Sequence, residues 1–312
     1  GGPLRRGGAD GPGVVVSMEG CLKLEFASRD GVTQIVDRYQ RAPLQVQKVL
    51  HPHGAHPGMA WVYIVSIAGG IVQGDRLQIE IVARDGAQVH LTTPAATKIY
   101  RSPACPSCHL LRIRAGAGTY VEYLPGPVIP FRGARFLEEV TLVAHPTATL
   151  LFGGILSPGR VAMGESHVYD LYSSRITAEG EDGALEFLDI MHLTPATIPP
   201  KRPGLLGRFD VLGTLHLLTG KGTAREFGDR LHRLLQEHGE ILAGASELPS
   251  GRGVTVRILG RQVEPVAAAL QAVFVVARAA ILGAAELGGS GTSDRSGSGL
   301  QESQGGLSAT GE

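Results

Sequence analysis

The chain has 312 residues, in which 29 lysine and arginine side chains are balanced by 29 aspartate and glutamate side chains. A net charge of zero argues against a protein that holds nucleic acid by bulk electrostatic attraction, because neutralising phosphates needs a basic surplus or a basic stripe. Three cysteines are too few for a disulfide framework. The sequence does not open with the pattern of a secretory signal peptide, a positively charged segment followed by an apolar one, which argues against secretion. We therefore expect a cytoplasmic protein that binds no nucleic acid.

Both ends of the chain are of low complexity. Residues 1–13 are rich in glycine, and residues 288–312 are rich in glycine and serine. Such segments cannot bury enough apolar surface to offset the entropy of ordering, so they are predicted to be a flexible N-terminal tail and a disordered C-terminal tail. Because no internal repeat and no linker interrupts the remainder, residues 14–287 are expected to form a single domain.

Taken in chain order, the first expected strands lie at 22–26, 61–68 and 77–81, and later ones lie at 209–218 and 254–258. The first, third and fifth of these alternate apolar and polar residues, which predicts half-buried strands. The other two are continuous apolar runs, which predict strands covered on both faces. Many short strands separated by glycine-containing turns predict a mostly β fold.

Helical periodicity is clear only near the C-terminus. A first helix is expected between Thr223 and Ile241, where apolar residues recur at helical spacings: Phe227, Leu231, Leu234 and Ile241. A second is expected to begin at Pro265, since proline is favoured at the first helical position. It would bury one face made of Val266, Leu270, Val273, Phe274, Ala277 and Ile281. Because Gln271 and Arg278 interrupt its apolar run to fewer than about 18 residues, we expect a buried helix and not a membrane span.

The chain lacks the sequence patterns of common nucleotide and catalytic sites. The segment GGIVQGD at 69–75 is glycine-rich, but it has neither the lysine nor the hydroxyl residue of a phosphate-binding loop and it ends in an anion, Asp75. No G-x-G-x-x-G opens a helix after a strand, G-x-S-x-G is absent from the part expected to be ordered, and H-E-x-x-H is absent. The glycines of 69–75 are therefore interpreted as turn residues.

The sharpest local pattern is C-x-x-C-H at Cys105, Cys108 and His109. It matches covalent haem attachment, and C-x-x-C alone can hold half of a zinc site or form a redox pair. Haem is disfavoured because the chain shows no export signal. A structural zinc site needs four ligands, so the fold would have to bring in one of three other histidines: His51, His53 and His56. A plain loop with two thiols is the favoured interpretation.

The same three histidines, His51, His53 and His56, lie in the proline- and glycine-rich segment 51–58. Neutral imidazole suits nickel and zinc, so this loop is a weak candidate for a transient metal site. The favoured interpretation is that these surface histidines bind nothing in particular.

Several charged residues lie within apolar strands or beside glycine turns: Asp75, Lys98, Arg101, Glu122, Arg132, Arg135, Arg160 and Glu165. A buried ion is costly unless it is paired, so one interpretation is that carboxylate–guanidinium pairs lock these turns together. The other is that the residues form a polar interior passage or a surface that binds a partner. The pattern alone leaves both open.

Six segments, taken in order, resemble the UreD family of urease accessory proteins. They are GGIVQGD, TTPAATKIYRS, EYLPGPVIPFRGARF, ILSPGRVAMGE, LEFLDIMHLTP at 185–195, and GVTVRILG, with Arg278 in the last helix. They occur in the family's order and approximate spacing from about Gly20 to Leu282, which is nearly all of the chain expected to be ordered. No single motif is diagnostic, but six collinear motifs are.

The resemblance implies a mostly β, single-domain fold with β-helix-like stacked sheets and about two helices near the C-terminus. It also implies a non-catalytic maturation chaperone with no tightly bound cofactor. Such proteins bind apo-urease and recruit a helical UreF-type adaptor, which docks a UreG-type GTPase that carries nickel. This chain would be the scaffold and also a conduit with which nickel has only transient contact.

Within that resemblance, four residues are expected to face an interior polar passage: Asp75, Thr97, Lys98 and Glu165. Carboxylates suit a passage because weak oxygen ligation lets a borderline cation leave again. Five others are expected to lock turns or contact a partner: Arg101, Glu122, Arg132, Arg135 and Arg160. Two features depart from the family pattern. Gly126 stands where an acidic residue is usual, and the C-x-x-C-H segment is not typical of the family and inherits no nickel role.

Two other functions remain as alternatives at this stage. One is a metal-dependent hydrolase or oxidoreductase that uses Cys105, Cys108 and His109. The other is a β-rich binding module unrelated to urease. The first would carry stoichiometric metal and show turnover, and the second would not associate with apo-urease.

Overall fold

The computed structural model describes residues 17–52 and 56–283. The two predicted tails, 1–13 and 288–312, and His53 lie outside the described residues.

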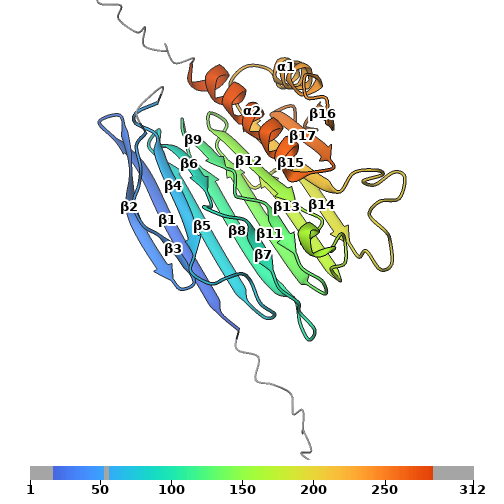
Figure 1. Ribbon diagram of the computed structural model, residues 1–312. Coiled ribbons are helices and arrows are strands. Elements are labelled where there is room, and N and C mark those ends of the chain that lie inside the picture. Colours follow the sequence, from blue (N-terminus) through green and yellow to red (C-terminus); the bar gives the residue numbers. More distant parts are fainter. Residues whose placement is uncertain (1–16, 53–55, 284–312) are drawn as a thin grey trace, which may run out of the picture.

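The chain winds as a β-helix in which four successive coils each add one strand to each of two sheets (Figure 1). One sheet receives the parallel strands β4 (Ala60–Ser66), β6 (Gln88–Thr92), β9 (Tyr120–Tyr123) and β12 (Thr149–Leu156). The other receives the parallel strands β5 (Arg76–Arg84), β8 (Ser107–Ala115), β11 (Arg135–Ala144) and β13 (Leu171–Glu179). The expected mostly β fold with stacked, β-helix-like sheets is confirmed.

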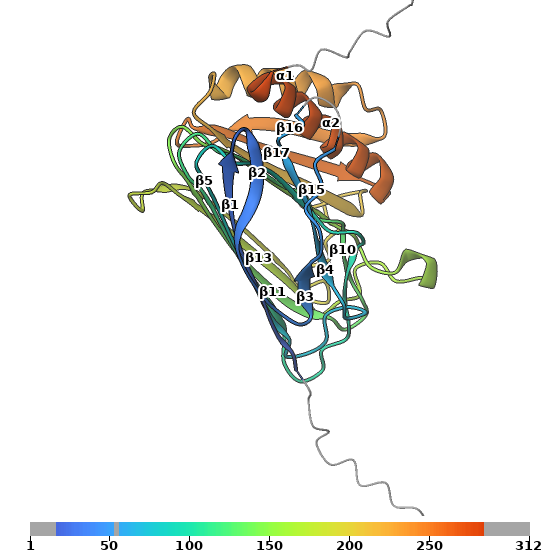
Figure 2. The same ribbon diagram turned by 90° about the vertical axis from the view of Figure 1, so that its left-hand side faces the viewer.

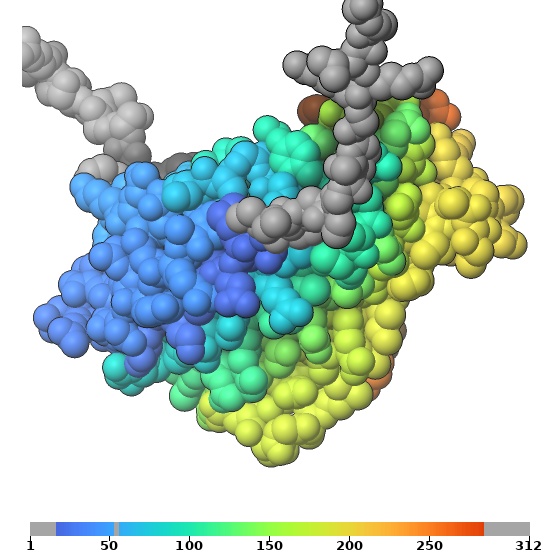
Figure 3. All heavy atoms as spheres, turned by 90° about the horizontal axis from the view of Figure 1, so that it is seen from below, coloured from blue at the N-terminus to red at the C-terminus, as the bar shows by residue number. Residues whose placement is uncertain are grey.

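Further strands complete both sheets. The seven-stranded sheet gains β1 (Glu19–Arg29) and β2 (Val32–Arg41) at one end and β14 (Leu185–Leu193) at the other. The second sheet gains β3 (Leu44–Val46) at one end, and at the other β15 (Val211–Thr219), β17 (Gly253–Gly260) and β16 (Ile241–Glu247). Seen from below, the colours of the sequence run in order from blue to yellow across the molecule, as expected when each coil packs beside the one before (Figure 3).

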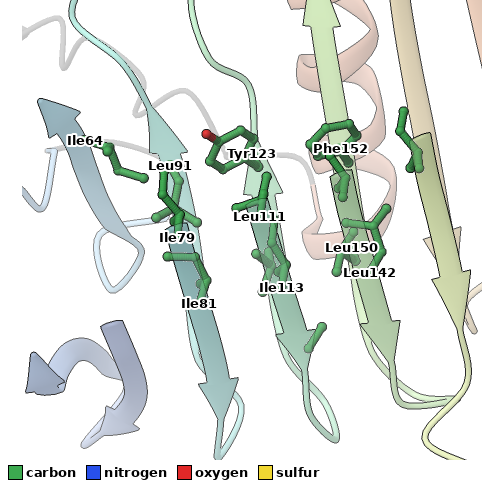
Figure 4. Packing of buried hydrophobic residues seen from close by; sticks show 14 of the residues in the cluster. Ile64, Ile79, Ile81, Leu91, Leu111, Ile113, Tyr123, Leu142, Leu150 and Phe152 are labelled. Atoms are coloured by element: carbon green, nitrogen blue, oxygen red, sulfur yellow. The ribbon is translucent and has the colours of Figure 1, made fainter. Parts of the chain in front are cut away.

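Equivalent side chains of successive coils stack into rows between the sheets (Figure 4). The parallel register places Ile79 beside Leu111 and Ile81 beside Ile113, and all four are buried. Strict alternation along each strand therefore gives a continuous apolar core, as the sequence pattern predicts. The apolar run 209–218 is covered on both faces as expected, whereas the run 61–68 leaves Tyr63 exposed, so that prediction is wrong for its outer face.

Two helices cover the outer face of the second sheet (Figure 1). α1 (Ala224–Gln236) begins with a capping box between Thr223 and Glu226, and it ends before the predicted residue Ile241, which instead starts β16. α2 (Val263–Leu282) begins two residues before Pro265. By length and composition α2 could cross a membrane, but it packs on β12, β15 and β17 and buries all six apolar residues predicted for its inner face.

Each coil passes from the second sheet to the first through a loop at the same corner. We call these four segments, 67–75, 93–106, 124–134 and 157–170, the corner loops. They contain the short strands β7 (Thr97–Ile99) and β10 (Val128–Pro130), which pair with each other, and the 3-10 helix η1 (Val161–Met163). η1 projects from the body beside β10 (Figure 2). Four of the six motifs therefore occupy equivalent corners of successive coils.

Candidate functional site

A cavity of about 320 Å³ lies between the two sheets. Its walls are mostly apolar, but β8, β11 and β13 contribute a polar group made of His109, Glu138, Tyr172 and Ser174. The exposed residues of its lining are the last residue of β4, the middle residue of β7 and residues of the loops beside these strands: Ser66, Gly69, Pro94, Ala95 and Lys98. The cavity therefore reaches the surface at the corner loops.

Glu138 is the only carboxylate in the described lining of this cavity. Its Oε1 lies 3.3 Å from Nδ1 of His109, and its Oε2 accepts hydrogen bonds from Ser174 Oγ at 2.9 Å and Tyr172 Oη at 3.4 Å. Burial raises the pKa of Glu138, but the hydrogen bond from His109 and those from the two hydroxyls outweigh it and leave the pKa below its ordinary value. The cavity thus holds an ionised carboxylate with an imidazole beside it.

Glu138 is not among the residues predicted from the sequence, although the sequence contains a signal for it. In β11 the buried residues Phe136 and Val140 flank Glu138 at a spacing of two. Because side chains at that spacing share one face of a strand, Glu138 had to face the core. A carboxylate at a core position of an alternating strand is a stronger indication of a functional site than a carboxylate beside a turn.

The four residues predicted for a polar passage lie in different surroundings. Thr97 and Lys98 line the cavity where it reaches the surface, whereas Asp75 and Glu165 are not part of its lining. Asp75 is buried and accepts backbone hydrogen bonds from Met18 and Val72 at 2.8 and 2.9 Å. Its carboxylate thereby closes the turn before β5. A passage role for all four stays a prediction.

Glu165 is held by Arg160. The Nε and Nη2 atoms of Arg160 donate to the two carboxylate oxygens at 2.8 and 2.5 Å, and the backbone N–H of Arg132 donates at 3.3 Å. The hydrogen bonds from Arg160 lower the pKa of Glu165 below its ordinary value. The guanidinium of Arg160 also lies 4.2 Å from the ring centroid of Phe131. This geometry fits the turn-locking interpretation of Arg160.

The remaining predicted arginines differ in exposure. Arg132 and Arg101 are exposed, and Arg101 forms a β-bridge with Ala134. Arg135 is half-buried at the start of β11, where its carbonyl accepts from Ser107 at 3.4 Å. Partner contact by these arginines stays a prediction.

Glu122 lies outside the cavity, on the opposite face of the second sheet, beneath α2. It is fully buried and accepts hydrogen bonds from Arg278 at 2.9 and 2.5 Å, from Tyr120 Oη at 2.5 Å and from His90 Nδ1 at 2.7 Å. Burial raises its pKa, but His90 and Arg278 together lower it below the ordinary value. His90 stacks on Trp61, 4.2 Å between centroids. The network ties α2 to the sheet, which fits a structural role for Glu122.

The sequence-predicted metal ligands do not converge. Cys108 and His109 are neighbours on β8 and so point to opposite faces, and His109 turns inward to Glu138. The described cysteines are all free thiols. His51 is exposed and bonds to the carbonyl of Thr33 at 2.8 Å, while His56 lies near Arg278, and burial and that charge lower the pKa of His56. Among the described residues no group of three or more histidine, cysteine, aspartate and glutamate side chains is placed to hold a metal ion.

Comparison with known proteins identifies the family of the chain. The family model described as "UreD urease accessory protein" matches residues 18–288. A "Urease accessory protein UreD" of Cenarchaeum symbiosum (strain A) is 35% identical over 264 residues, which cover 85% of this chain and 93% of that protein. A "Urease accessory protein UreD 2" of Streptomyces griseus is 36% identical, covering 85% and 90%, and one of Brucella suis biovar 1 is 37% identical, covering 84% and 88%. The chain belongs to the UreD family of urease accessory proteins, which are non-enzymatic chaperones of urease maturation.

Proposed function

We propose that this protein acts in the cytoplasm as a scaffold that binds apo-urease and a helical adaptor, through which the adaptor's nickel-carrying GTPase is recruited. We further propose that nickel moves through the cavity between the two sheets and touches the pair Glu138 and His109 on the way. The observation that carries the proposal is that Glu138, with His109 beside it, is the one carboxylate in the described lining of a mostly apolar cavity.

The Glu138–His109 pair suits transit better than storage. A carboxylate and an imidazole are both acceptable ligands for nickel. A stable structural metal site usually has four protein ligands, and a lone pair offers two. A cation would therefore be attracted to this point and would leave it again. The hydroxyls of Ser174 and Tyr172 donate hydrogen bonds to Glu138 and hold its carboxylate in place when no cation is bound.

A scaffold role also requires surfaces for partners. Several large apolar side chains of the described residues are exposed, among them Ile190 of β14 and Val161 and Met163 of η1. Val161 and Met163 lie together in η1, and apolar residues that are exposed together are typical of proteins that bind other proteins.

The proposal is tested by nickel-dependent activation of apo-urease with purified accessory proteins. The informative variant is Glu138→Gln, and its matched control is Glu139→Gln, since Glu139 is the next residue of β11 and is exposed. We expect Glu138→Gln to bind apo-urease and the adaptor as the unmodified protein does but to activate urease several-fold less. Glu139→Gln should do both normally.

Two results would contradict the proposal in different ways. Normal activation by Glu138→Gln removes the passage through the cavity and leaves the scaffold. Failure of the unmodified protein to associate with apo-urease and the adaptor removes the scaffold itself.

A further inference from the structure

We infer that the corner loops form the surface on which apo-urease docks, and that the docked segment of urease is acidic with an apolar centre. The inference rests on the proposed scaffold role and adds to it the place of the contact and the chemistry of the partner. It is carried by the exposure, the mutual contacts and the charge of these loops and by the opening of the cavity at the first two of them.

Large apolar side chains are exposed on three of the four corner loops. Val161 and Met163 of η1 are 65% and 70% exposed, and Ile67 is 63% exposed. Val72 and Tyr100 are also exposed. Each such side chain is ordinary by itself, but five of them on the first, second and fourth of four successive corner loops supply apolar contacts of the kind that bind protein.

Contacts between the loops join these residues into one rigid surface. Tyr100 Oη lies 3.5 Å from the carbonyl of Gly69, and the Tyr100 ring packs edge-on against Phe131 with centroids 5.0 Å apart. The guanidinium of Arg160 covers Phe131 and is itself held by Glu165. Backbone bonds from Ile71 to Lys98 and from Tyr100 to Ile71, at 2.8 Å each, join the first two loops. A surface already in place loses little conformational entropy when a partner binds.

The charge of the surface indicates an acidic partner. Lys98, Arg101 and Arg132 are exposed, and the first two take part in no ion pair among the described residues. The carboxylates of the same loops are largely unavailable, since Asp75 is buried in backbone hydrogen bonds and Glu165 is paired with Arg160. The third carboxylate, that of Asp170, is exposed. Three exposed cations against one exposed anion favour carboxylates on the partner.

The position of the surface selects urease as the partner. The exposed residues of the cavity lining lie within or beside the corner loops, so a cation in the cavity is released there. The exposed cations Lys98, Arg101 and Arg132 form a positively charged rim, in which Lys98 is the residue that lines the cavity, and this charge opposes the passage of a free divalent cation into solvent. An acidic partner that neutralises the rim removes this barrier and is placed to receive the ion. The chain belongs to a family of urease accessory proteins, so urease is the protein that is matured. The acceptor docked at the rim is therefore apo-urease.

The experiment measures binding of purified apo-urease and, separately, of the purified helical adaptor to variants of the full chain. Two variants change the surface: the double substitution Lys98→Glu with Arg101→Glu, and Met163→Asp. Two matched controls change exposed residues of β8 on the outer face of the seven-stranded sheet: Arg112→Glu with Arg114→Glu, and Leu110→Asp. Every substituted residue is exposed, and thermal unfolding verifies that each variant folds.

The expected result is that each surface variant binds apo-urease about tenfold or more weakly, a loss typical of replacing a central contact residue. Binding of the adaptor and both controls should be unaffected. The affinity for apo-urease should also fall as NaCl rises from about 0.05 to about 0.5 M, and the charge-reversed variant should lose this dependence.

Three results would overturn the inference. Surface variants that bind apo-urease normally show that it docks elsewhere. Loss of adaptor binding in place of urease binding shows that the loops hold the adaptor. If the unmodified protein does not bind apo-urease at all, the inference fails together with the proposed function, and this outcome is distinguished from the others because it needs no variant.

Discussion

Glu138 Oε1 faces His109 Nδ1 at 3.3 Å across the neighbouring parallel strands β11 and β8. The register that pairs these two residues also pairs Phe136 with Ser107 and Val140 with Leu111, so both polar residues occupy positions of the buried row. One residue to either side, Cys108 and Glu139 point to the opposite face. Each cavity residue, His109 and Glu138, thus has a sequence neighbour on the opposite face, Cys108 and Glu139, that serves as a control for substitution.

The first prediction compares a residue of the cavity, His109, with the two cysteines of the C-x-x-C-H motif. His109→Ala removes the imidazole beside Glu138, so we expect nickel-dependent activation of urease to fall several-fold. The single variant Cys108→Ser and the double variant Cys105→Ser with Cys108→Ser should leave activation unchanged, because neither thiol lines the cavity. The measurement is urease activity at limiting nickel after maturation with each variant. Loss with the serine variants and none with His109→Ala would show that the thiols carry the metal.

A second prediction concerns the ion pair beneath α2. Arg278→Met leaves the buried charge of Glu122 without its guanidinium partner, with only His90 and Tyr120 bonded to it, so the free energy of unfolding should fall by about 3 kcal/mol. Adding Glu122→Gln removes that charge and should restore much of the loss. Chemical denaturation of the single and double variants measures both. Arg233→Ala on the exposed side of α1 is the control. If the double variant is no more stable than the single one, packing of α2 and not charge burial determines the cost.

The Glu122–Arg278 pair also illustrates how far the sequence could be read. The sequence left open whether Glu122 is paired or belongs to a passage or a partner surface, because its partner lies 156 residues away and no local pattern connects the two. The alternation of polar and apolar residues predicted strands. Their parallel winding depends on pairings between coils, and only the family resemblance suggested it.

The wrong helix end has a local cause. Apolar spacing extended the first predicted helix to Ile241, yet the helix ends at Gln236. A turn at Gly239 then lets Ile241 pair with Gly260 as the first residue of β16. An isoleucine at helical spacing and one at the start of a strand are alike in sequence, and the pairing with β17 decides between them.

A third prediction uses pH. Burial raises the pKa of Asp189, but the hydrogen bond from His216 and the charge of Arg257 outweigh it and lower the pKa to about 2. A carboxylate whose pKa is lower in the folded state stabilises the protein above its unfolded pKa and ceases to do so as pH falls through the folded value. We expect about 1–2 kcal/mol, after allowance for solvent screening, to be lost between roughly pH 5 and pH 2.

The measurement is the free energy of unfolding against pH for the unmodified protein and for Asp189→Asn. The variant should be less stable at pH 7 and should show a shallower loss between pH 5 and pH 2. Parallel curves would mean that Asp189 has the same pKa in the folded and unfolded states.

The last prediction compares two neighbouring glycines of a corner loop. A Cβ atom on Gly70 would lie 2.8 Å from the carbonyl oxygen of Lys98 and would also collide with the Tyr100 ring, whereas one on Gly69 would approach nothing closer than Tyr100 Oη, at 3.7 Å. Gly70→Ala should therefore displace Tyr100 from Phe131 and destabilise the protein by about 1–3 kcal/mol, the usual cost of overpacking. Gly69→Ala should change stability by about 0.5 kcal/mol or less. Thermal unfolding gives the stabilities, and binding of apo-urease reports on the surface. Because Tyr100 belongs to the inferred docking surface, Gly70→Ala should also weaken the binding of apo-urease. Equal stability and equal binding of the two variants would show that the close approach of Gly70 to Tyr100 does not hold the corner loops in place.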